Sequence, residues 1–281
     1  MIQAWIKLWA HREHPLSLAL FRIAIAVVIL SDLLTILRLD LVQTLFAPAE
    51  AGGLSDVVAR GKEPWIYQLF GASAATASGL YWVMLVACVL ILFGVLTPVS
   101  CLVMLLAWSQ HAQIAPAADR GIDLLLRNML FLLMFSGSGR CLSVDSFFRK
   151  RRLYDPTEEC MAWPRYLIVL QVVVMYTAAG IEKMGFAWTP LGGYSALYLI
   201  LQDWAVARYL FDWLAVQPFY FLTQVGTAGT LLWEWTAPLM LYALYIKATP
   251  HKSGRYRDWM EKIHFRECWL LMGLTFHISL F

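Results

Sequence analysis

Residues 124–135 read LLLRNMLFLLMF, and this run decides the class of fold. Its apolar residues follow one another without the in-and-out alternation that a transmembrane β-strand of about 10 residues requires. In lipid, every backbone N–H and C=O must be satisfied internally, and a helix does this within a single segment. The run therefore predicts a membrane helix and argues against a transmembrane barrel.

The whole chain has the composition of an integral membrane protein. Of its 281 residues, 60% are hydrophobic and 15% are charged, and the mean hydropathy is +0.62. This is more apolar surface than one soluble core could bury. Segments of about 20 mainly apolar residues, the length that crosses a bilayer as a helix, recur between short charged or Pro/Gly-rich connections. We therefore exclude a soluble globular protein.

We expect an all-α fold, a polytopic transmembrane helical bundle with about seven spans. The expected spans are 16–37, 79–97, 99–115, 121–138, 164–184, 218–246 and 265–281. Residues 1–281 are expected to form a single transmembrane domain. Because the chain ends inside or just after an apolar segment, we expect either a short final helix or a domain whose C-terminus is incomplete.

Lys and Arg residues set the expected orientation, because basic residues near helix ends stay in the cytoplasm. The two richest basic runs, 149–152 and 247–266, lie two spans apart and therefore on the same side. Placing both runs inside makes the N-terminus cytoplasmic. The connections 38–79 and 185–217 are then external. Their aromatic residues, Trp204 among them, form either an interfacial belt or a lid over an external site.

Other features narrow the location and the partners. The first span is too long for a signal-peptide core, and the short loops favour a bacterial inner membrane. Five cysteines without a CxxC pattern do not indicate a disulfide framework. The net charge of +3 is carried mostly by loops, which suits anionic lipid headgroups. The sequence contains no recognisable nucleic-acid module, so we expect the lipid bilayer as a partner and no nucleic acid.

Several ionisable residues fall inside the expected spans, where each costs at least ~2.5 kcal/mol and is expected to have a partner. Asp123 and Arg127 are spaced i, i+4, so they can neutralise each other on one helix. Arg22 and Asp32 are about 15 Å apart along a helix and cannot pair directly. Glu234 is a candidate partner for Arg22. The histidines are widely separated in sequence, so no metal site is expected.

The fifth expected span carries the densest set of candidate functional residues. At about 100° per residue, Tyr176, Gly180 and Lys183 share one helix face, and Glu182 points about a quarter-turn away. Gly180 is small enough to let another helix or a flat ligand approach the backbone. A lysine in an apolar site can be a neutral amine and act as a general base. The alternative is that Lys183 extends outward to the interface, paired with Glu182 or not.

The order of residues in this span resembles the signature helix of the HTTM superfamily. The matching residues are Gln171, Tyr176, Ala179, Gly180, Lys183, Met184, Trp188, Gly193 and Tyr194. Weaker landmarks in the expected order are Arg22, Asp32, Asp123, Glu234 and His277. This superfamily comprises the membrane domain of vitamin K-dependent gamma-glutamyl carboxylase and its bacterial relatives.

The resemblance implies an enzyme that uses a reduced quinone, a vitamin K hydroquinone-like cofactor, with a lysine base facing the periplasm or lumen. In the carboxylase, reduced vitamin K, O2 and CO2 serve to remove a γ-proton from a peptide glutamate and to carboxylate it. The catalytic lysine corresponds by motif to Lys183. The implied activity is thus that of a quinol-dependent carboxylase/epoxidase-like lyase acting on a secreted peptide or protein.

The site residues follow from the resemblance together with the intramembrane polar residues. The candidate catalytic residues are Lys183, Glu182, Glu234 and His277, and the candidate cofactor-binding residues are Tyr176, Gly180, Trp188 and Arg22. The chain differs from the carboxylase at two places. The carboxylase has a second lysine where this chain has Glu182, and it has an Asn-His pair where this chain has residues 119–121.

The sequence leaves two other functions open besides the enzyme. The first is a non-catalytic membrane factor for the maturation or export of a secreted peptide or toxin. The second, a transporter, has less support because the sequence lacks an internal repeat and paired Gly/Pro-interrupted helices.

Overall fold

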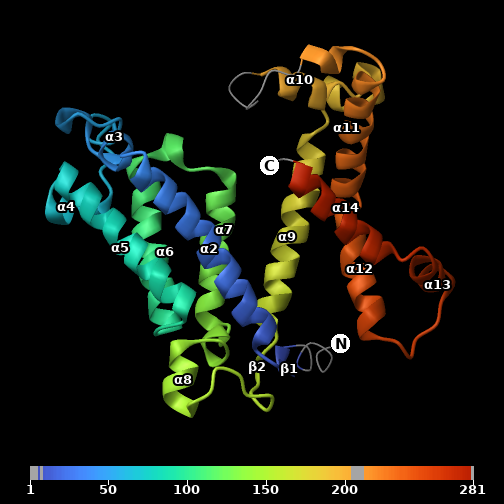
Figure 1. Ribbon diagram of the computed structural model, residues 1–281, viewed down its shortest axis with the longest axis horizontal. Helices are drawn as coiled ribbons and strands as arrows, with labels where there is room; N and C mark the ends of the chain where they lie inside the picture. Colours follow the sequence, from blue (N-terminus) through green and yellow to red (C-terminus); the bar gives the residue numbers. More distant parts are fainter. Residues whose placement is uncertain (1–5, 7–8, 204–211, 280–281) are drawn as a thin grey trace. The chain divides into compact units, whose positions relative to one another are not determined.

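The computed structural model describes residues 6, 9–203 and 212–279, and Trp204 of the expected aromatic segment lies outside them. The regular elements of the described chain are helices and one two-stranded sheet (Figure 1). It forms two compact units, Met1–Ile168 and Val169–Phe281. The expected all-α class is confirmed.

The first unit is built on the helices α2 (Leu16–Arg38), α5 (Ala74–Phe93), α6 (Thr97–Ile114) and α7 (Gly121–Phe135). α2 packs against α5, α5 against α6, and α6 against α7, as Figure 1 shows. Fully or almost fully buried alanines lie on these helices, among them Ala19, Ala26, Ala77 and Ala87. Small residues let membrane helices approach closely, which favours van der Waals packing between them.

Short elements connect the long helices of the first unit. They are α3 (Val42–Phe46), η1 (Ala49–Ala51), α4 (Trp65–Phe70), η2 (Pro116–Ala118), η3 (Ser138–Arg140) and α8 (Val144–Lys150). Strand β1 (Arg12–Glu13) pairs antiparallel with β2 (Cys160–Met161). Arg165 donates hydrogen bonds of 2.7 and 2.6 Å to the two carboxylate oxygens of Glu13. This pair ties the N-terminal strand to the start of the next helix.

That next helix, α9 (Trp163–Glu182), begins in the first unit and continues into the second. It is followed by η4 (Phe186–Trp188), η5 (Pro190–Gly192), α10 (Ala196–Gln202), η6 (Asp212–Ala215), α11 (Phe219–Trp235), α12 (Ala237–Ala248), α13 (Arg255–Lys262) and α14 (Phe265–Ser279). α14 contacts α11, α12 and α13. The buried core of this unit includes Val173, Trp233, Met240 and Trp269.

The helices identify an integral membrane protein. Within the described residues, α2, α5 and α9 are long and apolar enough to cross a bilayer, and α12 is a shorter apolar helix. The expected segments 16–37, 99–115 and 164–184 coincide with α2, α6 and α9 to within two residues at each end.

The sixth expected span, 218–246, is two helices instead of one. α11 ends at Trp235 and α12 begins at Ala237. Pro238 has no N–H to donate, and in a continuous helix its ring would clash with the carbonyl of Glu234, four residues earlier. The N–H of Leu239 donates instead to the carbonyl of Thr236 at 3.0 Å. The break therefore leaves Glu234 in the last turn of α11.

Candidate functional site

The second unit brings Lys183 and Glu234 together as an ion pair. Lys183 follows the end of α9, and its Nζ donates to Oε1 of Glu234 in the last turn of α11. The Glu234 side chain is 3% exposed and the Lys183 side chain 25% exposed. The second carboxylate oxygen, Oε2, is buried and accepts no hydrogen bond from the described residues. The pair thus combines a partly accessible amine with a buried carboxylate, one oxygen of which has no partner in the described structure.

α9 and α11 touch beside this pair because Gly180 has no side chain. Trp235 Nε1 donates to the Gly180 carbonyl at 2.8 Å. A Cβ on Gly180 would lie 2.7 Å from Cδ1 of Trp235 and 3.0 Å from Cβ of Glu234. The sequence suggested that another helix or a flat ligand approaches the backbone at Gly180. In the structure, helix α11 lies there.

One turn earlier in α9, Tyr176 joins the same face to α14. Its Oη and His277 Nε2 are 2.7 Å apart in a hydrogen bond. The Tyr176 ring packs on Trp233, with ring centroids 4.5 Å apart. Trp233 and Trp269 stack, and each indole N–H donates to the other's carbonyl at 3.0 Å. Tyr176, Gly180 and Lys183 therefore all contact residues 233–235 of α11, which agrees with a shared face.

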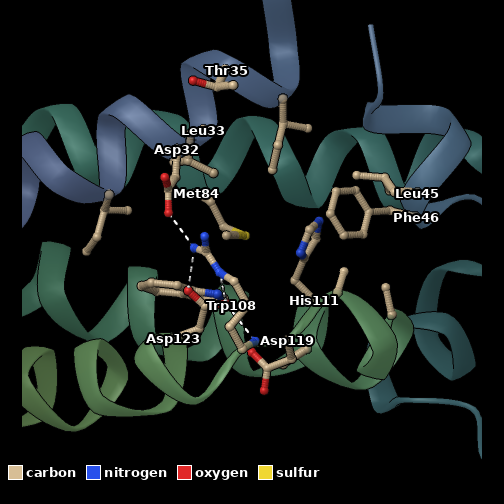
Figure 2. Close-up of a pocket in the computed structure, with 16 residues that line it drawn as sticks. Asp32, Leu33, Thr35, Leu45, Phe46, Met84, Trp108, His111, Asp119 and Asp123 are labelled. Atoms are coloured by element: carbon tan, nitrogen blue, oxygen red, sulfur yellow. Dashed lines mark hydrogen bonds and ion pairs between the residues drawn. The ribbon is translucent and has the colours of Figure 1, made fainter. Parts of the chain in front are cut away.

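The first unit contains a second group of ion pairs, around the start of α7 (Figure 2). Arg120 Nη2 donates to Asp32 of α2 at 2.5 Å and to Asp123 at 2.9 Å. Arg127 donates to both carboxylate oxygens of Asp119, at 2.6 and 2.8 Å. The expected pairing of Asp123 with Arg127 is therefore wrong. Asp123 instead caps α7, accepting the Arg120 backbone N–H at 2.8 Å.

These residues border a mainly apolar pocket of about 290 Å³. Figure 2 shows Met84 and Trp108 in its walls, with His111 beside Phe46. The ring centroids of His111 and Phe46 are 3.5 Å apart. Nε2 of His111 is buried and has no hydrogen-bond partner among the described residues. The pocket volume is at the lower end of the range for small-molecule sites, about 300 Å³.

A family model, the HTTM domain, matches residues 11–249 and so covers most of the chain. The chain belongs to the HTTM family. The resemblance drawn from the α9 motif is thereby confirmed, and the chain is related to gamma-carboxylase at the level of this family. No curated protein and no solved structure matches it.

The remaining predicted site residues of this HTTM protein lie in different surroundings. Trp188 belongs to the second unit, with its ring centroid 5.3 Å from Nζ of Lys183, within cation–π range. Glu182 is exposed, and Lys183 binds Glu234 instead of this neighbour. Arg22 is fully buried in the first unit and donates to the carbonyl of Leu142 at 2.6 Å.

Arg22 was also expected to pair with Glu234; the two residues belong to different units, and this pairing stays a prediction. Oε1 of Glu234 accepts from Lys183, while two guanidinium nitrogens of Arg22 have no partner among the described residues.

Three residues of the HTTM chain complete these clusters but were not among the sequence candidates. Trp235 packs on Gly180 and donates a hydrogen bond to its carbonyl. The sequence feature that could have identified Trp235 is its position directly after Glu234. Asp119 and Arg120 supply the partners of the charged residues in α7, and their signal was their position directly before that helix. Charged side chains just before a helix can pair with charged side chains in its first turns. Spacing rules that consider only residues within the helix do not predict such pairs.

Chemically, the Lys183–Glu234 pair of the HTTM fold can hold and move one proton. In either form, ammonium with carboxylate or amine with carboxylic acid, the pair has no net charge. Both forms reach the same positively charged state when they accept one proton, so the pair behaves as a single acid–base unit. No group of three or more His, Cys, Asp or Glu side chains in the described residues could hold a metal ion.

Proposed function

We propose that this HTTM protein is a membrane enzyme related to vitamin K-dependent gamma-glutamyl carboxylase, in which the Lys183–Glu234 pair moves a proton at the hydroxyl of a reduced quinone. The observation that carries the proposal is the pair itself, a family-motif lysine bound to a carboxylate that is 3% exposed and has one oxygen without a partner among the residues described. Ionisable residues within a membrane domain are costly and are commonly functional.

The membrane topology in this proposal has about seven spans and a cytoplasmic N-terminus in a bacterial inner membrane. α11 and α12 together make one crossing, interrupted at Thr236. The basic runs 149–152 and 247–266 support the orientation, because they follow α7 and α12 and would both face the cytoplasm. The end of α9, with Lys183, then faces the periplasm, where it would meet a secreted peptide or protein substrate.

The donor set fits a quinol in its chemistry. Oε2 of Glu234 is a buried acceptor without a partner among the described residues, and a quinol hydroxyl is a donor. Trp188 and Tyr176 supply aromatic faces that would hold a ring, with Trp188 already beside the lysine ammonium. A bound reduced quinone would supply the electrons for a reaction with O2. The protein's own part is to orient the hydroxyl and to accept its proton at the pair.

The Tyr176–His277 hydrogen bond gives the site a second proton-carrying group. His277 is exposed, whereas Tyr176 is partly buried against Trp233. Histidine and tyrosine side chains can each donate and accept a hydrogen bond, so this pair can pass a proton along it. In this proposal, His277 and Tyr176 have a supporting role beside the Lys183–Glu234 pair.

The test is to look for a bound quinone by mass spectrometry after organic extraction of the detergent-purified protein. Wild type, Lys183→Ala and Glu234→Gln would be compared with Lys247→Ala, an exposed lysine at the end of α12 in the same unit. We expect a stoichiometric quinone in wild type and in the Lys247 variant, and its loss in the other two. Size-exclusion profiles and thermal unfolding show whether each variant remains folded.

A folded wild-type protein without quinone would contradict the enzyme proposal. If such a preparation retained a secreted peptide or a partner protein, and Lys183→Ala retained it too, the non-catalytic maturation or export factor would replace the enzyme as the proposed function.

A further inference from the structure

A cavity of about 300 Å³ lies in the first unit between the start of α6 and the segment that follows α7. Its polar lining consists of Thr97, Ser138, Arg140, Asp145 and Arg149. None of these residues borders the pocket of Figure 2. The cavity is therefore a separate candidate site on the first unit.

Two buried hydroxyl groups in this cavity lack hydrogen-bond partners within the described part of the chain. Thr97 is 1% exposed and Ser138 is fully buried, and neither hydroxyl has a hydrogen-bond partner among the described residues. A Cβ on Gly139 would lie 2.6 Å from Oγ1 of Thr97, so this glycine lets the chain after α7 approach the Thr97 hydroxyl. Buried hydroxyls normally have partners, because leaving one unpaired costs free energy. The two groups are donors suited to an acceptor from outside the chain.

The charges around the cavity favour an anion. Arg140 and Arg149 line it with side chains that are 47% and 48% exposed, and both lie near one carboxylate, Glu158, at 3.6 and 3.9 Å. Asp145 also lines the cavity, but its two oxygens already accept the backbone N–H groups of Leu96 and Thr97 at 2.9 and 3.3 Å. Arg140 Nη1 also donates to the Glu159 carbonyl at 2.9 Å. Each guanidinium has five N–H donors, so both keep further donors for a phosphate, which a guanidinium can bind through two parallel hydrogen bonds.

The surface beside the cavity has the composition of a membrane-contacting segment. Phe147 and Phe148 on α8 are 43% and 70% exposed, and Leu153 is 52% exposed. The basic run 149–152 lies between them in sequence. Exposed aromatic and aliphatic residues next to a basic cluster favour contact with anionic lipid at the membrane surface.

We propose that this cavity binds the phosphate group of an anionic phospholipid. The Thr97 and Ser138 hydroxyls and the Arg140 and Arg149 guanidiniums would donate to the phosphate oxygens, while the exposed phenylalanines of α8 contact the acyl region. The lipid would fix the connection between α7 and α9 to the membrane surface. This site does not depend on the quinone proposal, since it shares no residue with the Lys183–Glu234 pair.

Native mass spectrometry of the full-length protein in detergent, titrated with phosphatidylglycerol or phosphatidylcholine, tests the site. Wild type is expected to retain phosphatidylglycerol in preference to phosphatidylcholine. Thr97→Val combined with Ser138→Ala removes only the two hydroxyls, and we expect about tenfold weaker phosphatidylglycerol binding. The lipid-free thermal stability of this variant should be at least that of wild type, because neither hydroxyl has a protein partner in the described residues.

Arg149→Gln and Arg151→Gln form a matched pair, because only Arg149 lines the cavity although both belong to the basic run. We expect the first change to weaken phosphatidylglycerol binding and the second to leave it close to wild type. Equal losses in both, with no effect of the hydroxyl variant, would mean diffuse charge attraction and would overturn the site.

A titration with inorganic phosphate distinguishes a lipid ligand from a free phosphate ion. At millimolar concentration in lipid-free micelles, phosphate is expected to leave the unfolding temperature unchanged. Phosphate that displaces phosphatidylglycerol and stabilises the protein to the same extent would overturn the lipid assignment.

Discussion

Lys183 and Glu234 stand 51 positions apart in the sequence and form one ion pair in the second unit. The pair exists because Gly180 lets α11 approach α9 and because α11 ends next to Glu234, ahead of Pro238. The burial of its partners is unequal, with 25% of the Lys183 side chain exposed and 3% of the Glu234 side chain. The free-energy cost of breaking the pair therefore comes mainly from leaving the buried Glu234 carboxylate without its cation.

Replacing Lys183 alone should destabilise the protein strongly. Lys183→Met leaves Glu234 buried without its cation, and we expect a loss of ~3 kcal/mol in the free energy of unfolding, the lower end for a broken buried pair because the lysine is partly exposed. Chemical unfolding in detergent micelles measures this difference.

The control removes both charges. Lys183→Met combined with Glu234→Leu leaves no buried charge behind, so its stability should return to within ~1 kcal/mol of wild type. A double variant as unstable as the single one would show that the carboxylate is not left unpaired in the single variant, contrary to the structure.

Gly180→Ala should also destabilise the second unit. The added Cβ would lie 2.7 Å from Trp235 and 3.0 Å from Cβ of Glu234, so α9 and α11 must move apart, at a cost of ~1–3 kcal/mol. Gly229→Ala in α11 is the matched control, because a Cβ there meets no atom within 4 Å in the described structure, apart from its own stretch of helix. Alanine favours a helix more than glycine does, so the control should gain up to ~1 kcal/mol. Thermal unfolding that ranks the two variants in the reverse order would contradict this helix contact.

The sequence predicted helices well where a long apolar run has clear ends. α2, α6 and α9 lie within two residues of their expected bounds because such runs have only one solution in lipid. The run 218–246 looked equally continuous, and its break at Thr236 depends on one residue, Pro238, placed inside an otherwise unbroken apolar pattern.

The candidate site was predictable in its residues more than in its pairings. The α9 motif identified Lys183, and 3.6-residue periodicity placed Tyr176, Gly180 and Lys183 on one face. Pairing depends on contacts between distant segments, for which sequence spacing contains no rule. The i, i+4 rule failed for Asp123 and Arg127 because the residues just before α7 supply closer partners.

The Arg127–Asp119 pair should show a large coupling energy. Their side chains are 11% and 22% exposed and joined by two hydrogen bonds, which predicts a coupling of ~1–3 kcal/mol in a double-mutant cycle of Arg127→Gln and Asp119→Asn. A parallel cycle of Arg127→Gln and Asp123→Asn is the control, because Asp123 binds Arg120 instead. A larger coupling in the second cycle would restore the i, i+4 pair and contradict the structure.

Acid should lower the stability of the loop between α8 and α9, because it protonates the carboxylates that Lys150 binds there. Lys150 donates to Asp155 at 2.8 Å and to Glu158, and these hydrogen bonds hold the pKa of both carboxyls below their ordinary values. Carboxyls with a lowered pKa in the folded state contribute stability in full above their unfolded pKa, about 4, and lose it as the pH falls below that value. Unfolding temperatures at pH 7 and pH 3 should therefore differ more in wild type than in Lys150→Met.

Lys252→Met is the control, since Lys252 binds Tyr245 Oη, and its replacement should leave the wild-type difference unchanged. Equal acid sensitivity in wild type and Lys150→Met would mean that this cluster does not stabilise the folded loop.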